Sequence, residues 1–203
     1  DCKASLTNDA NAAALGEKYY GVAVDLNDFI VITLGTGLGS GIFSGGRLLY
    51  GYDGFAGEMG HMPIEYDGRK CNCGNYGCLE SYASASGIKT TVEEFLIDNP
   101  DNTFLNTIYI NNGIDGLVLD EEFDKGNTIA RKIYEFTGQK LGIGLAQAAV
   151  LLSPEVFIFY GGFSNAGERL LKPAKRAMDE APIAKPETKV ITLDKSEPLF
   201  SPP

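Results

Sequence analysis

The chain has 203 residues, 44% of them apolar, and a formal net charge of −10, which suits one globular domain over residues 1–203 that buries roughly 70% of its unfolded surface. So acidic a surface repels duplex DNA, and we expect no nucleic-acid partner for this segment. No apolar run reaches the roughly 20 residues that cross a bilayer and no basic, then apolar leader opens the chain, so we expect a cytoplasmic protein without a membrane partner.

The first predicted elements are a helix and a strand. Residues 9–20 are rich in alanine, with Asn8 or Asp9 as N-cap and Gly21 as the stop, and predict a helix. The β-branched run FIVITL at 29–34 predicts a strand.

Glycine dominates the next part of the chain. The Gly-rich stretch 35–41 is followed by a pattern at 41–51 that predicts one or two more strands, which together make a β-meander with tight turns. Residues 51–78 hold further glycines and three cysteines, and predict irregular backbone held by a metal. A helix is expected over 79–98, broken near Gly87.

The second half of the chain predicts alternating helices and strands. Residues 98–126 carry no clear pattern, whereas apolar residues recur at helical spacing over 127–152 and predict a long, largely buried helix. A strand, a turn, a helix and a strand are expected in that order at 155–160, Gly161–Gly162, 165–180 and 189–193. This order of elements is typical of an α/β fold, a mixed sheet flanked by helices.

The cysteines cluster with the one histidine of the chain. The spacing His61-x9-Cys71-x-Cys73-x4-Cys78 offers three thiolates and one imidazole, a closed set that suits structural Zn²⁺. The alternative is an ordinary histidine near buried thiols. A disulfide between Cys71 and Cys73 would close a strained ring and is disfavoured in a reducing cell. Cys2 has no partner that the sequence identifies.

The glycines of the GTGLGSG stretch alternate strictly, at 35, 37, 39 and 41. This spacing matches no G-x-G-x-x-G frame, and a strand rather than a helix follows, so a dinucleotide-binding fold is excluded. A glycine-rich turn between strands can instead let a phosphate approach bare N–H groups, with the hydroxyl of Thr36 nearby. A tight hairpin without a ligand is the alternative.

Three carboxylates stand among small residues rather than among other charges: Asp9, Glu58 and Glu80. Glu58 precedes His61 by three residues and Glu80 follows Cys78 by two, so a bound metal would fix both positions. Taken singly, Asp9 could be a helix cap, and the two glutamates could be solvated surface charges.

Together these motifs resemble the ROK family of sugar kinases and repressors, and within it the glucokinase-like members. The residues that carry the resemblance are TNDANAAALGE (7–17), the run from Leu34 to His61, CNCGNYGCLESYAS (71–84) and SPEVFIFYGGFS (153–164). The resemblance implies an actin-like ATPase (ribonuclease H-like) lobe with a zinc-stapled loop, and transfer of phosphate from ATP with Mg²⁺ to a hexose hydroxyl, glucose being the first expectation.

The resemblance also implies roles for individual residues. Asp9 would be the general base, and the backbone at Gly35, Thr36 and Gly37 would hold the ATP phosphates, while Gly161 and Gly162 would lie against the adenosine. The residues expected to bind the other sugar hydroxyls are Asn8, Glu58, His61 and Glu80. A metal-bound imidazole keeps one N–H free, so His61 could also donate to the sugar.

The resemblance is partial, and two other functions stay open. The family's N-terminal phosphate-loop lobe and its final helix have no counterpart here, so we expect one lobe of a two-lobed kinase, inactive alone, that pairs as a homodimer or larger. A sugar-sensing lobe of a ROK-type repressor is the first alternative. A zinc-ribbon interaction module is the second, and it would leave Asn8, Glu58 and Glu80 without a role.

Overall fold

A mixed five-stranded sheet forms the centre of the fold. The computed structural model describes residues 6–110, 113–181 and 188–192. The strands lie in the order β3-β2-β1-β6-β7. The pairs β3–β2 and β2–β1 are antiparallel, and the pairs β1–β6 and β6–β7 are parallel. Their bounds are β1 Phe29–Leu34, β2 Leu38–Ser44, β3 Arg47–Leu48, β6 Val156–Tyr160 and β7 Lys189–Thr192. The predicted mixed sheet is therefore confirmed, although position 193 lies outside the described residues.

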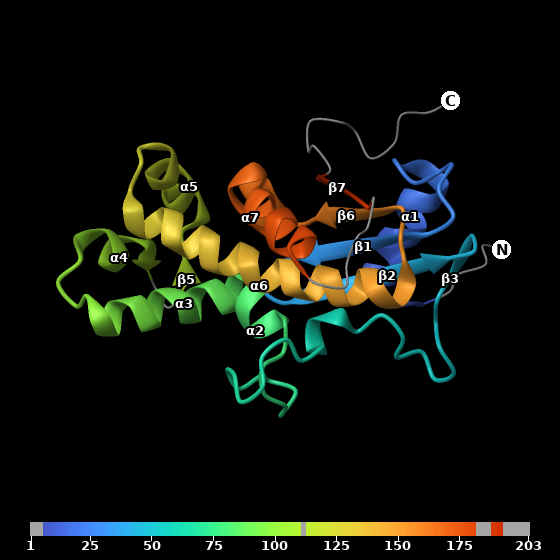
Figure 1. Ribbon diagram of the computed structural model, residues 1–203, viewed down its shortest axis with the longest axis horizontal. Helices are drawn as coiled ribbons and strands as arrows, with labels where there is room; N and C mark the ends of the chain where they lie inside the picture. The colour runs from blue at the N-terminus through green and yellow to red at the C-terminus, as the bar shows by residue number, and fades with distance from the viewer. Residues whose placement is uncertain (1–5, 111–112, 182–187, 193–203) are drawn as a thin grey trace.

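Helices cover both faces of this sheet (Figure 1). On one face lies α1 (Asp9–Tyr20), and on the other lie α6 (Thr128–Leu152) and α7 (Glu168–Asp179). Alternate side chains of a strand point to opposite faces, and because helices cover both faces of the sheet, strand β1 is buried on both sides. Phe29 and Val31 belong to the small cluster under α1, while Ile30, Ile32 and Leu34 belong to the large one under α6.

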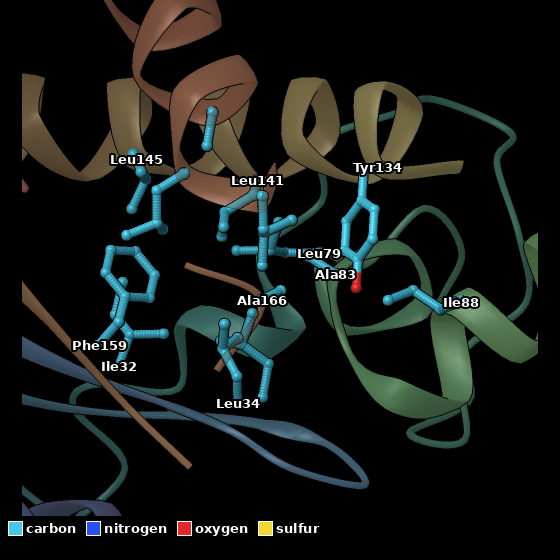
Figure 2. Packing of buried hydrophobic residues seen from close by; sticks show 14 of the residues in the cluster. Ile32, Leu34, Leu79, Ala83, Ile88, Tyr134, Leu141, Leu145, Phe159 and Ala166 are labelled. Atoms are coloured by element: carbon cyan, nitrogen blue, oxygen red, sulfur yellow. The ribbon is translucent and has the colours of Figure 1, made fainter. Parts of the chain in front are cut away.

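The large cluster joins the sheet to the helical half of the molecule. Figure 2 shows Leu141 and Leu145 of α6 packed over the sheet residues Ile32 and Phe159. From the same helix, the ring of Tyr134 reaches toward the helices that precede α6 in the chain (Figure 2). Ala83 and Ile88 of those helices, and Leu79 just before α2, also belong to the core. Burial of each leucine, isoleucine and phenylalanine side chain in this cluster stabilises the fold by about 1.5–3 kcal/mol.

The helix predicted over 79–98 is two helices, and the break expected near Gly87 lies three residues earlier, at Ser84. α2 (Glu80–Ala83) ends at Ser84, and α3 runs from Ala85 to Asp98. Ser84 is extended (φ −127°, ψ 172°), and its hydroxyl accepts a hydrogen bond from the N–H of Gly87. Serine caps a new helix in this way, so the chain kinks three residues before the glycine.

The stretch 98–126 had no predicted structure, and its described part after α3 forms short elements at the end of α6 away from α1 (Figure 1). These are α4 (Thr103–Ile108), β4 (Tyr109–Ile110), β5 (Gly113–Ile114) and α5 (Gly116–Asp124). Asn127 then caps α6 by accepting from the N–H groups of Ile129 and Ala130.

Two 3-10 turns complete the described elements, η1 (Met59–His61) and η2 (Gly162–Ala166). None of the described helices is both long and apolar enough to cross a bilayer.

Candidate functional site

Residues 38–41 of strand β2 form a platform on which the segments that carry the predicted site residues pack. The structure places residues 38–41 in this strand, so the turn after β1 comprises only Gly35–Gly37, shorter than the predicted Gly-rich stretch. A Cβ at Gly41 would lie 2.6 Å from the carbonyl oxygen of Ala10, and one at Gly39 would lie 3.1 Å from the Cβ of Ala10. These two glycines therefore let the first turn of α1 rest directly on β2.

The first turn of α1 presents Asn8 and Asp9 to solvent at this platform. Asn8 is the N-cap, and its Oδ1 accepts from the N–H groups of Ala10 and Asn11. The amide Nδ2 of the same side chain remains as a donor. Asp9 is the first helical residue, and its Oδ1 accepts from the N–H of Ala10 at 2.8 Å. The cap is thus Asn8, which leaves the exposed carboxylate of Asp9 available for another role.

The segment that carries Glu58 and His61 crosses the same stretch of β2. The hydroxyl of Ser40 donates to the carbonyl of Gly57 and accepts from the N–H of Met59 at 3.4 Å. A Cβ at Gly60 would lie 2.2 Å from the carbonyl oxygen of Leu38, so only glycine permits this approach. Glu58 is exposed and His61 is half-buried.

Glu80 reaches the platform from the first residue of α2. Its Oε2 accepts a hydrogen bond from the N–H of Leu38 at 2.9 Å, and a Cβ at Gly37 would lie 2.4 Å from the same oxygen. The Cβ of Glu80 would lie 3.6 Å from one on Gly60. The structure thus brings the segment before His61, the carboxylate of Glu80 and the start of α1 onto four consecutive residues of β2.

His61 and the three neighbouring cysteines form a compact ligand set. A ring nitrogen of His61 and the sulfurs of Cys71, Cys73 and Cys78 all lie within 4.8 Å of one another. Cys71 Sγ lies 3.7 Å from His61 Nδ1, and Cys73 Sγ lies 3.7 Å from Cys78 Sγ. Four such atoms around one zinc ion would be about 3.5–3.8 Å apart, so the residues fit tetrahedral Zn²⁺. Cys2 lies outside the described residues.

The thiols of this set differ in their surroundings. The N–H of Asn75 donates toward Cys73, which is exposed, and lowers the pKa of its thiol. Burial raises the pKa of Cys78 to about 12. A thiol that is buried this way is a poor nucleophile but becomes a thiolate when a metal binds, which fits a structural role better than a catalytic one.

In the glycine turn (Gly35–Gly37) the carbonyl groups are all anchored, that of Gly37 by the N–H of Gly35 at 3.0 Å. The carbonyl of Gly35 accepts from the N–H of Ala85 at 3.0 Å. The carbonyl of Thr36 accepts from the N–H of Ser86 at 3.3 Å and from its hydroxyl at 2.7 Å. A trans peptide group points its C=O and N–H in opposite directions, so the N–H groups of Thr36 and Gly37 point away from α3. Neither N–H meets an acceptor within the described residues.

A second glycine loop lies beside this turn. Strands β1 and β6 are parallel neighbours, with Thr33 opposite Tyr160, so the loops that follow them meet at one edge of the sheet. Gly161 has φ +110°, and a Cβ there would lie 2.4 Å from the carbonyl oxygen of Leu34. In open α/β sheets, ligands bind in crevices at the carboxyl ends of the strands.

A pocket of about 500 Å³ opens beside Gly162. It combines apolar side chains with two carboxylates and one amide, and its lining residues are Ile114, Asp115, Gly116, Leu117, Asp120, Tyr134, Gly162, Phe163, Asn165 and Ala166. Most of these residues were missed at the sequence level. Those from residues 114–120 lie in the stretch that had no interpretable pattern, and only the pair at 161–162 pointed toward this place.

Comparison with known proteins identifies relatives of two kinds. The sequence profile of the ROK family matches residues 1–198. A glucokinase from Halalkalibacterium halodurans is 39% identical over 173 residues, which are 83% of this chain and 52% of that protein. The DNA-binding transcriptional dual regulator NagC of Escherichia coli is 32% identical over 173 residues, 82% of this chain and 40% of that protein.

The fold of this chain also matches a solved structure from the same family. The crystal structure of a ROK family glucokinase from Streptomyces griseus, in complex with glucose and AMPPNP, matches with a TM-score of 0.81 and 36% identity, over 92% of this chain and 62% of that one. The chain spans about half the length of the curated relatives it matches.

Proposed function

The chain belongs to the ROK family, and we propose that the whole protein is a cytoplasmic, ATP-dependent hexose kinase with a glucokinase-like sugar site. This chain would be the zinc-bearing lobe of a two-lobed enzyme that works as a homodimer or larger. The observation that carries the proposal is the meeting of α1, the 57–61 segment and Glu80 on residues 38–41 of β2, directly beside the glycine turn.

The sugar would lie over β2, held by side chains that offer both donors and acceptors. Nδ2 of Asn8 and the free Nε2–H of His61 would donate to hydroxyl oxygens, and the carboxylates of Glu58 and Glu80 would accept from hydroxyl protons. The resident zinc ion would supply no chemistry, since its role is to hold the loop that carries His61 and precedes Glu80.

Asp9 would act as general base. Its carboxylate takes the proton of the attacking sugar hydroxyl while that oxygen forms a bond to the γ-phosphorus of ATP and the bond to the leaving ADP breaks. The N–H groups of Thr36 and Gly37 would bind phosphate oxygens, with Mg²⁺ balancing the remaining charge. The adenosine would occupy the pocket beside Gly162, between its apolar walls.

A sugar-sensing lobe of a transcriptional repressor is the second candidate, because the relatives include NagC as well as glucokinases. The exposed Asp9 favours the kinase, since binding without chemistry needs no base.

A coupled assay with glucose, N-acetylmannosamine and fructose in the presence of ATP and Mg²⁺ tests the proposal on the full-length protein. Phosphorylation of one hexose supports it. Binding of the sugar without turnover would overturn it in favour of the repressor, and no binding of any sugar would overturn both.

A further inference from the structure

Arg69 lies just before the cysteine loop (Cys71–Cys78) and is almost buried. Only 11% of its side chain is exposed. The guanidinium lies 4.7 Å above the ring centroid of Tyr82 and 5.3 Å from that of Phe136. Its own backbone N–H donates to the hydroxyl of Tyr82 at 2.7 Å, so both ends of the residue are fixed against α2.

The guanidinium of Arg69 spans the kink between α2 and α3. Nη1 donates to the carbonyl of Ser81 and to that of Gly87, each at 3.0 Å. Nη2 donates to the hydroxyl of Thr91 at 3.0 Å, and Nε and Nη2 together pair with the carboxylate of Glu94. One side chain thus ties α2 to the first three turns of α3.

The two carbonyls that Arg69 holds are adjacent to the two substrate contacts. Ser81 follows Glu80, whose carboxylate is fixed on the N–H of Leu38. Gly87 follows Ser86, whose N–H and hydroxyl hold the carbonyl of Thr36. A change in the kink would therefore move the carboxylate of Glu80, which is proposed to bind the sugar, together with the glycine turn.

Resting on the kinase function proposed above, we propose that Arg69 is a positioning residue for both substrates. It fixes the α2–α3 kink so that Glu80 faces the sugar and the N–H groups of Thr36 and Gly37 face the phosphates. Ser86 acts on the glycine turn only, because its N–H and hydroxyl hold the carbonyl of Thr36.

Lysine cannot replace arginine in this place. Its ammonium carries three donors on a single point, whereas the planar guanidinium reaches two carbonyls, a hydroxyl and a carboxylate that lie in different directions. Arg69→Lys keeps the charge and the apolar stem, so its effect isolates the loss of this geometry.

Steady-state kinetics of the full-length protein test the proposal. Arg69→Lys should raise the KM for glucose and the KM for ATP, each about tenfold, as expected for the loss of one or two charge-assisted hydrogen bonds. Ser86→Ala should raise the KM for ATP about threefold to tenfold and leave the KM for glucose within about twofold, because it loses only the hydroxyl bond to the turn.

Two matched variants serve as controls. Arg131→Lys changes an exposed arginine of α6, and Ser44→Ala removes a hydroxyl at the far end of β2. Neither should change either KM. A folded Arg69→Lys variant with both KM values at the wild-type level overturns the proposal, and so does a Ser86→Ala variant with an unchanged KM for ATP.

Two further arrangements keep the result decisive. If Arg69→Lys fails to fold, Glu94→Gln takes its place, since it weakens the pairing of Arg69 from the solvent side and should raise both KM values in the same proportion. If the wild-type protein phosphorylates no hexose, the kinase function fails by itself. Calorimetric titration of glucose into wild type and Arg69→Lys then tests the positioning of Glu80, and equal affinities would contradict it.

Discussion

The carboxylate of Glu80 accepts a hydrogen bond from the backbone N–H of Leu38, 42 positions earlier in the chain, at 2.9 Å. Leu38 is the first residue after the glycine turn, and Glu80 is the first residue of α2. The residue proposed to hold the sugar thus also holds the end of the turn proposed to hold the phosphates. Alterations in the turn should therefore reach the sugar site.

Two glycines of the turn should respond differently to alanine. In Gly37→Ala the new methyl would lie 2.4 Å from Glu80 Oε2, so the carboxylate must move and glucose affinity should fall about tenfold or more. In Gly35→Ala the methyl meets nothing within 4 Å, so Tm and glucose affinity should match wild type. Thermal melting and glucose titration of the pair check this, and equal glucose affinities in the two variants would contradict it.

Asp9→Asn should separate chemistry from binding. Asparagine keeps the size of the side chain and the acceptor for the N–H of Ala10, but it cannot take a proton at neutral pH. We expect kcat to fall about 10²- to 10⁴-fold with little change in the KM for glucose. Asp25→Asn, an exposed aspartate in the turn after α1, is the control and should keep wild-type kcat. A kcat within tenfold of wild type in Asp9→Asn would remove the general base from the mechanism.

Metal analysis should find one zinc ion per chain. Cys78→Ser should abolish it, lower Tm and weaken glucose binding, because the loop before Glu80 loses its anchor. Cys2→Ser should keep the metal, since His61, Cys71, Cys73 and Cys78 complete a tetrahedral set without it. Elemental analysis and melting of the purified variants give the answer. Full zinc content in Cys78→Ser would rule out this ligand set.

Gly162→Leu should block the nucleotide without disturbing the sugar. A side chain at this position meets no atom within 4 Å of its Cβ and would extend into the pocket of about 500 Å³. The KM for ATP should rise about tenfold or more while glucose affinity stays unchanged. Gly16→Leu, on the exposed side of α1, provides the matched insertion. Unchanged ATP kinetics in Gly162→Leu would place the adenosine elsewhere.

Glu17→Gln should stabilise the protein at neutral pH. Burial raises the pKa of Glu17 above 4.5, although the N–H of Val22 donates to its carboxylate. The folded chain therefore binds this proton more tightly than the unfolded chain, and stability falls as pH rises from about 4.5 through the folded pKa. We expect Tm of Glu17→Gln to exceed that of wild type by about 1–3 °C at pH 7 and to match it at pH 4. The exposed Glu180→Gln variant should show no such difference, and a lower Tm for Glu17→Gln at pH 7 would contradict the sign.

Much of the fold was predictable because single segments carry strong patterns. The β-branched run of β1 and the helical spacing of α6 each point to one structure, and the order of elements then indicates a mixed sheet. The break was expected near Gly87 because glycine is the more familiar signal, whereas it lies three residues earlier because the hydroxyl of Ser84 caps the next helix.

The candidate site was predictable where the chain brings residues close by itself. The spacing of Cys71, Cys73 and Cys78 left little choice, and the structure places His61 with them. The pocket beside Gly162 was not predictable, since its walls come from residues 114–120, Tyr134 and residues 162–166, which lie far apart in sequence. Arg69 was missed for the same reason, because nothing near it in the sequence shows that it joins two helices.

The alternating glycines after β1 are required mostly by packing, so finding them in a sequence reports the fold rather than a particular activity. Three of the four, Gly37, Gly39 and Gly41, leave room for Glu80 and for α1, and only at Gly35 is there open space. A chain that keeps this packing needs glycine at these three positions, whatever its function. A signature built on them sorts proteins by ancestry, and a genome survey that uses it will gather enzymes and regulators alike.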